Sequence, residues 1–126
     1  MTELSALEMA VGVLLARQIS PDESQVLIEQ LKSAQVSMRD FTGVGFYTEF
    51  SVDKGLAPVN VKSSPGGWVR SEVGPNAYPL EFMLYVRDGY AEMIEAYSFF
   101  DGYGDLDLLT ASFTAPEQIT PEMLNG

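Results

Sequence analysis

The amino-acid sequence predicts an α+β fold in which an N-terminal helical hairpin packs on one face of a twisted antiparallel sheet of four to six strands. The spacing of apolar residues changes from a helical to an alternating period after residue 34. Asp88-Gly89 joins two alternating runs, and several further Gly and Pro turn signals separate short elements. The 126 residues suit a single domain, with a helical hairpin at 1–35, the sheet at 36–100 and a loop-rich acidic tail at 101–126.

The first helix is predicted from apolar residues that recur three and four positions apart. These residues are Leu4, Leu7, Val11, Leu14 and Leu15. Thr2 is a candidate N-cap. Gly12 interrupts the pattern at a cost of about 1 kcal/mol relative to alanine, which is tolerable if another element packs closely against it.

The second helix is predicted from the sequence Ser20-Pro21-Asp22-Glu23, which has the form of a capping box. Ser20 would be the N-cap, Pro21 the first helical residue and Glu23 the third. An apolar stripe follows at Val26, Leu27, Leu31 and Ala34. The short linker to the first helix predicts that the two helices form a hairpin.

Two short antiparallel regions are predicted between residues 36 and 79. Alternation over residues 41–52 indicates a strand, in which Gly43 and Gly45 favour a bulge or a close backbone approach. Residues 59–62 and 68–73 are expected to pair as a hairpin across the Ser64-Pro65-Gly66-Gly67 turn signal.

The most distinct hairpin is predicted over residues 80–98. Asp88-Gly89 favours a two-residue type I′ turn, which sets Phe82 opposite Glu95. One face then carries apolar side chains that should pack on the helices, with Glu95 as the exception. The other face combines apolar and charged side chains, namely Glu81, Met83, Tyr85, Arg87, Tyr90, Glu92 and Ile94. A partner or a second copy in a homodimer would cover such a face.

The composition excludes several classes of chemistry. The chain has no cysteine and no histidine, so disulfides, thiolate or imidazole metal sites and histidine-based nucleophilic catalysis are excluded. The order of ligands in residues 101–107 does not fit an EF-hand loop. We therefore expect no cofactor and no dedicated metal site.

The net charge of −11 and the isoelectric point near 4.1 argue against binding to nucleic acid or to an anionic membrane surface. The apolar stretch at residues 9–16 is too short to span a bilayer, and no basic segment precedes it. A cytoplasmic protein is expected. The acidity would steer a basic partner toward the chain, or would simply keep the protein soluble.

Glu95 is the candidate catalytic residue under one hypothesis. A carboxylate on a core-facing strand must find a partner or shift its pKa upward, and Arg39, Arg70 or a tyrosine hydroxyl are candidate partners. One hypothesis is a small enzyme that uses a core-facing Glu95 with a tyrosine or an arginine. The structural alternative is a carboxylate at the sheet margin or in an ion pair.

The C-terminal third is the candidate partner-binding region. Eight acidic residues and no lysine or arginine follow Arg87, and aromatic residues are interleaved with them. Aromatic side chains supply binding energy and carboxylates supply steering. The residues expected to bind a partner are Tyr85, Tyr90, Glu92, Phe100, Asp101, Tyr103, Asp105 and Asp107. The alternative is a solvated edge whose aromatic residues belong to the core.

Two segments carry a family resemblance. The strand Phe41–Phe50 contains TGVGF, and residues 81–97 contain an RDG hairpin followed by Glu95-Ala96-Tyr97. Together they resemble a group of small uncharacterised bacterial proteins, in which glycine tends to stand at the place of Ala96. This resemblance covers residues 36–100 and implies no activity.

The acidic composition of the chain also resembles that of immunity proteins and other intracellular inhibitors. We therefore expect a non-enzymatic, immunity-type inhibitor of a basic effector such as a toxin or nuclease, including by mimicry of nucleic acid. A Glu95-dependent enzyme and a homo-oligomeric structural module are the alternatives.

Overall fold

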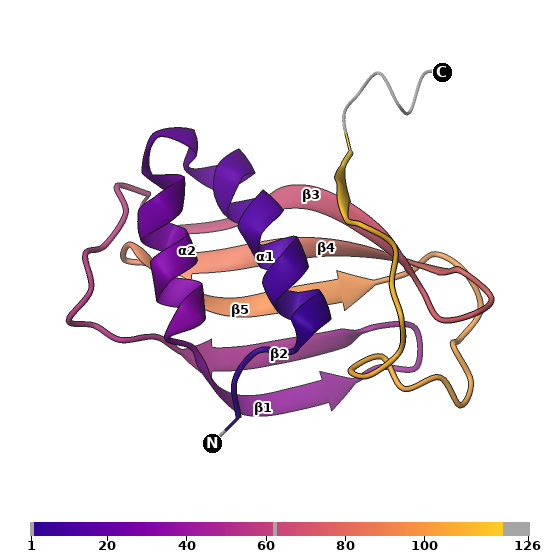
Figure 1. The fold of residues 1–126 in the computed structure, drawn as a ribbon. Helices are drawn as coiled ribbons and strands as arrows, with labels where there is room; N and C mark the ends of the chain where they lie inside the picture. The colour runs from indigo at the N-terminus through magenta and orange to yellow at the C-terminus, as the bar shows by residue number, and fades with distance from the viewer. Residues whose placement is uncertain (1, 62, 120–126) are drawn as a thin grey trace.

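The computed structural model describes residues 2–61 and 63–119 and has two layers, with both helices on one face of a six-stranded antiparallel sheet (Figure 1). The strand order is β1-β2-β5-β4-β3-β6. The elements are α1 (Ala6–Ile19), a 3₁₀ turn (Pro21–Glu23), α2 (Ser24–Lys32), β1 (Gln35–Phe41), β2 (Phe46–Ser51), β3 (Ser63–Val73), β4 (Tyr78–Arg87), β5 (Tyr90–Tyr97) and β6 (Glu117–Gln118). The predicted α+β fold is confirmed. Within the described ranges, none of the helices has the length and apolar character needed to cross a membrane.

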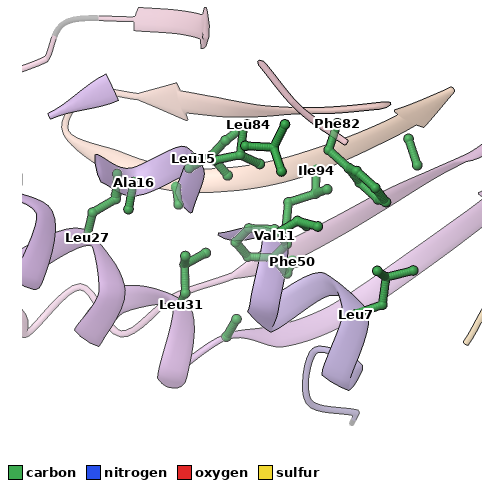
Figure 2. Packing of buried hydrophobic residues seen from close by; sticks show 14 of the residues in the cluster. Leu7, Val11, Leu15, Ala16, Leu27, Leu31, Phe50, Phe82, Leu84 and Ile94 are labelled. Carbon is green, nitrogen blue, oxygen red and sulfur yellow. The ribbon is translucent and has the colours of Figure 1, made fainter. Parts of the chain in front are cut away.

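The hydrophobic core lies between the helices and the sheet (Figure 2). Leu7, Val11 and Leu15 of α1 and Leu27 and Leu31 of α2 point toward the strands. The strands contribute Phe46, Phe50, Leu80, Phe82, Leu84 and Ile94. Burial of each such side chain stabilises the fold by about 1.5–3 kcal/mol. The apolar side chains at this interface therefore hold the helices on the sheet.

Gly12 lies on α1 against Leu31 of α2. A Cβ atom at this position would lie 2.9 Å from Leu31 Cδ1. The condition under which the glycine is tolerable is therefore met, because α2 packs closely against it and offsets its low helix propensity.

Both predicted helix caps were wrong in detail. The N-cap of α1 is Ser5, which forms a capping box with Glu8, whereas Thr2 forms an isolated β-bridge with Val36. Ser20 and Pro21 take the predicted N-cap and first positions, but of the 3₁₀ turn and not of α2, and the Ser20 side chain makes no capping bond. Glu23 instead accepts a hydrogen bond of 2.8 Å from the backbone N–H of Asn60.

The predicted hairpin of residues 59–62 with 68–73 was also wrong. β3 is one long strand that pairs with β4, with an irregularity in register between Gly66 and Val69. Gly67 adopts a φ of +82°, and a Cβ there would lie 2.5 Å from Leu15 Cδ2. The two glycines therefore form a bulge where α1 crosses the strand, not a turn.

The β4–β5 hairpin has the predicted turn but not the predicted register. Asp88 and Gly89 both have positive φ values, 53° and 86°, as a type I′ turn requires. Val86 pairs with Ala91 and Tyr85 with Met93, so Glu92 is an extra residue. A shift of one residue moves every later side chain to the opposite face of the sheet.

Glu95 was therefore wrongly placed toward the core. It lies opposite Met83 on β4, while Ile94 and Ala96 fill the helix-facing side. Phe82 pairs with Ala96 and not with Glu95.

The C-terminal tail is loop-rich in its described part and covers one edge of the sheet. Phe113 bridges to Val73, and β6 pairs with Val69 and Arg70 of β3. Leu108 is buried in the hydrophobic core, which fixes the middle of the tail. Residues 120–126 of the predicted tail lie outside the described residues.

Candidate functional site

The face of the sheet opposite the helices is the main candidate site, and we call it the open face. Both helices lie on the other side of the sheet (Figure 1). Alternate side chains of β2, β4 and β5 point away from the helices, and they remain partly or fully exposed. They are Tyr47, Glu49, Glu81, Met83, Tyr85, Met93, Glu95 and Tyr97. This set is rich in aromatic rings, thioethers and carboxylates.

Glu95 lies at the centre of this face with three tyrosines around it. Tyr47 is its neighbour on β2, and Tyr97 is two residues further along β5. The Tyr85 hydroxyl donates a hydrogen bond of 2.7 Å to Glu95 Oε1. We call Tyr47, Tyr85, Glu95 and Tyr97 the tyrosine–glutamate cluster. The β-bulge at Glu92 builds it, because the extra residue turns Glu95 and Tyr97 outward.

The tyrosine hydroxyls of this cluster stay protonated at neutral pH. The hydrogen bond to Glu95, together with partial burial, raises the pKa of Tyr85 to about 12. The negative charge of Glu95 raises the pKa of Tyr47. Burial raises the pKa of Tyr97, and the charges of Glu81 and Glu95 raise it further. The three tyrosines therefore offer hydroxyl donors and ring faces and do not act as bases.

Aromatic side chains continue from the cluster to the end of β5. Trp68 donates its indole N–H to Glu81, which pairs across the strands with Tyr97. The ring of Phe99 packs edge-on against Tyr97, with 5.6 Å between the ring centroids. Phe99 is 81% exposed and Phe100 is 65% exposed. Such exposure of large apolar side chains is typical of an interaction surface.

Residues 99–107, which we call the acidic loop, follow directly. Asp101 and Asp105 are exposed. Asp107 accepts a hydrogen bond of 2.9 Å from the Leu109 N–H, which holds the pKa of the Asp107 carboxyl below its usual value. Asp107 thus stabilises its own turn while remaining exposed, and the loop presents all three carboxylates, Asp101, Asp105 and Asp107, to solvent.

A pocket of about 480 Å³ separates the acidic loop from the turn between β3 and β4. Its lining includes Val73, Tyr78, Tyr103, Asp105 and Leu106. Tyr103 packs edge-on against Tyr78, with 5.9 Å between centroids. Of the predicted partner-binding residues, Tyr103 and Asp105 therefore form part of a largely apolar cavity.

The remaining predicted residues lie near the other end of β5. The Tyr90 hydroxyl donates to the carbonyl oxygens of Lys54 and Leu56, so this side chain fixes the connection between β2 and β3. Glu92 forms an ion pair of 3.2 Å with Arg87 at a groove of about 530 Å³. The structure thus brings Tyr85 into the cluster with Glu95, and it holds Tyr90 in a structural contact.

The two arginines proposed as partners of Glu95 pair with other carboxylates. Arg39 lies on the helix side of the sheet and forms an ion pair of 2.6 Å with Glu8. Arg70 pairs with Glu117 at 3.2 Å. Of the candidate partners predicted for Glu95, the structure therefore selects a tyrosine hydroxyl and neither arginine.

Among residues 2–61 and 63–119, Glu8 is the carboxylate that is fully buried, and the sequence patterns above did not single it out. Glu8 is fully buried and accepts hydrogen bonds from the Ser5 N–H, from Arg39 and from Thr48. Two signals pointed to it: the Ser5-x-x-Glu8 capping pattern and the position of Glu8 beside the apolar stripe of α1. Its saturated hydrogen bonding indicates a structural role.

Among residues 2–61 and 63–119, no group of three or more acidic side chains is arranged to hold a metal ion. Comparison with protein-family models, curated proteins and solved structures gives no match to this chain. The resemblance to small bacterial proteins therefore stays a prediction. The open face and the acidic loop are the features of the structure that bear on function.

Proposed function

We propose that this chain is a non-enzymatic binding protein that holds a basic protein partner on its open face and acidic loop. The single observation that carries the proposal is the continuous run of aromatic and acidic side chains from Tyr85 and Glu95 through Tyr97 to Phe99. Aromatic anchors beside carboxylates are the combination that protein interfaces use for affinity and specificity.

The charge of the whole chain supports a basic partner. Eighteen acidic residues face seven basic residues, and a net charge of −11 accelerates association with a cationic surface. On the open face itself, Glu49, Glu81 and Glu95 are accompanied by the Arg87–Glu92 pair. The local charge therefore has the same sign as the charge of the chain.

The finer form of the proposal is an immunity-type inhibitor, whose partner is an effector such as a toxin or a nuclease. A nuclease carries a basic surface for its substrate, and an acidic aromatic face would compete for that surface. The alternative hypothesis of an enzyme requires a core-facing Glu95. This requirement is not met, because Glu95 lies on the open face and accepts a hydrogen bond from a protonated tyrosine.

Affinity capture tests the proposal. The tagged chain is incubated with lysate of its source at low and moderate salt, and retained proteins are identified by mass spectrometry. The test variant is Asp101→Lys with Asp105→Lys. The control is Glu3→Lys with Asp22→Lys, which makes the same change in net charge at exposed positions outside the open face and acidic loop.

We expect a stoichiometric basic protein that is retained at moderate salt by the wild type and by the control, and lost from the test variant. If the test variant and the control lose the partner equally, the interaction depends on net charge alone, and the proposed binding surface is contradicted. If the wild type returns only itself, the homo-oligomeric alternative replaces the proposal. That alternative is favoured by one observation, the exposed Met38 and Phe41 on the edge strand β1.

A further inference from the structure

We propose that the tyrosine–glutamate cluster is a seat for an arginine side chain of the basic partner. This inference deepens the proposed function and depends on it for the source of the arginine. The cluster itself is a chemical site, and its selectivity can be measured with a peptide before the partner is known.

The position of Glu95 in the sheet gives the seat its walls. Tyr47 on β2 and Met83 on β4 are its direct cross-strand neighbours. Met93 and Tyr97 precede and follow it on the same face of β5. Directly opposed side chains in a sheet lie about 4.5–5.5 Å apart at Cβ, so rings and thioethers flank the carboxylate along and across the strands. Its remaining approach is from solvent, perpendicular to the sheet.

The Glu95 carboxylate is oriented but its charge is not neutralised within the described part of the chain. The Tyr85 hydroxyl bonds to Oε1 and fixes the direction of the group. The arginines that form ion pairs there do so with other residues: Arg39 with Glu8, Arg70 with Glu117 and Arg87 with Glu92. An incoming cation would thus meet a pre-positioned anion between aromatic rings, which lowers the entropy cost of binding.

The geometry favours arginine over lysine. A guanidinium group is planar, donates two parallel hydrogen bonds to one carboxylate and stacks on aromatic faces. It is also more weakly hydrated than an ammonium group, so less hydration is lost when it enters between Tyr47 and Tyr97. An ammonium group can approach the same carboxylate but makes neither the paired bonds nor the planar stacking.

Hexa-arginine and hexalysine peptides provide the test. Each peptide is titrated by calorimetry into the full-length wild type and into Glu95→Gln, and circular dichroism verifies folding of the variant. Glu3→Gln is the matched control, since it makes the same chemical change at an exposed position outside the open face and the acidic loop. Tyr97→Leu removes one ring while keeping an apolar side chain.

We expect hexa-arginine to bind the wild type several-fold more tightly than hexalysine. Glu95→Gln removes the ion pair and leaves the rings in place, which corresponds to a loss of about fivefold in hexa-arginine affinity. Tyr97→Leu should weaken hexa-arginine binding by about threefold, because one cation–π contact is removed. Glu3→Gln should change the hexa-arginine affinity less than twofold.

Three results would overturn the inference: no hexa-arginine binding by the wild type, equal affinity for the two peptides, or equal effects of Glu95→Gln and Glu3→Gln. The capture experiment separates this failure from failure of the proposed function. If Glu95→Gln retains a partner that the Asp101→Lys, Asp105→Lys variant loses, the result supports the partner-binding function and contradicts the arginine site at Glu95. If no partner is captured but arginine selectivity depends on Glu95, the seat stands without the proposed partner.

Discussion

Glu8 illustrates at the scale of one residue how this protein keeps a charge in its interior. The carboxylate is fully buried, and burial alone raises its pKa. The hydrogen bonds from Arg39, from the Ser5 backbone and from Thr48, with the charge of Arg39, outweigh burial and hold the pKa of Glu8 below 4.5. One side chain thereby connects the start of α1 to β1 and β2.

Removal of this carboxylate should destabilise the fold strongly. We expect Glu8→Ala to lower the free energy of unfolding by about 4 kcal/mol, because Arg39 is left largely buried without its partner. Ser5→Ala, which removes only the capping hydroxyl, should cost about 1 kcal/mol. Urea denaturation measures both, and equal losses would show that the ion pair adds nothing beyond the helix cap.

Glu8 should also make stability depend on pH. Because its pKa is lower in the folded than in the unfolded chain, its stabilisation is fully present above its usual pKa of 4.5. The stabilisation is lost as the pH falls through the lower folded value. Between pH 7 and pH 3, Glu8→Gln should therefore lose less stability than the wild type does, measured from urea midpoints. An identical acid response of the two proteins would assign the pH dependence to other carboxylates.

At the scale of secondary-structure elements, two glycines mark close approaches of different kinds. Gly45 lies against the backbone of β5, where a Cβ would come within 2.0 Å of the Ala96 carbonyl oxygen. Gly12 lies against α2, where the nearest atom is the end of the flexible Leu31 side chain. A backbone oxygen in a sheet cannot move aside, whereas a leucine side chain can change rotamer.

The two positions should respond differently to the same substitution. We expect Gly45→Ala to destabilise the protein by about 3 kcal/mol, since the strands must separate locally. In Gly12→Ala the gain in helix propensity, about 1 kcal/mol, offsets the repacking of Leu31. Thermal and urea unfolding of the two variants would show the difference. A cost for Gly12→Ala as large as that for Gly45→Ala would mean that Leu31 has no alternative packing.

Elements that depend on local chemistry could be predicted from the sequence. The two helices follow from apolar spacing, and the β4–β5 turn follows from Asp88-Gly89, since both rules act over a few residues. The bulge at Glu92 could not be found from the turn, because an inserted residue is selected by the packing of Ile94 and Ala96 beneath the helices. That single residue decided which face carries Glu95.

The candidate site could likewise be predicted only in part, because its geometry depends on the position of the bulge. Tyr85 and Glu95 were each singled out in the sequence, but on opposite faces of the hairpin, and their hydrogen bond depends on the shifted register. The apolar character of Ile94 and Ala96 was the signal that could have corrected it, because a shift by one residue buries both and exposes Glu95. The contact of Phe99 with Tyr97 depends on the chain path after β5, which the sequence pattern does not determine.

At the scale of the whole molecule, the excess of acidic residues opposes compaction. A net charge of −11 on a chain of 126 residues produces mutual repulsion in the folded state. The largely buried Glu8–Arg39 pair is screened much less by salt than the exposed carboxylates are.

Added salt should therefore stabilise the protein. Raising NaCl from about 10 mM to about 150 mM shortens the screening length from roughly 30 Å to 8 Å. If screening recovers about 1 kcal/mol, Tm rises by about 3 °C. The Asp101→Lys, Asp105→Lys variant and the Glu3→Lys, Asp22→Lys variant carry a lower net charge and should show a smaller rise in differential scanning calorimetry. A rise in Tm as large in both variants as in the wild type would show that the effect of NaCl does not come from screening of the net charge.

The unequal edges of the sheet limit how copies of this chain can associate through their strands. Residues 112–119 pair along the outer edge of β3, while β1 at the opposite edge is bridged only by Thr2 among the described residues. A sheet with two accessible edges can add strands without end and grow into a fibre. The edge opposite β1 is β6, which has only two residues and offers little strand to pair with, so pairing of β1 with β1 of a second copy uses the longer edge of both copies. Pairing of this kind stops at two copies. Residues 112–119, which cover the outer edge of β3, therefore limit strand-to-strand assembly to a dimer.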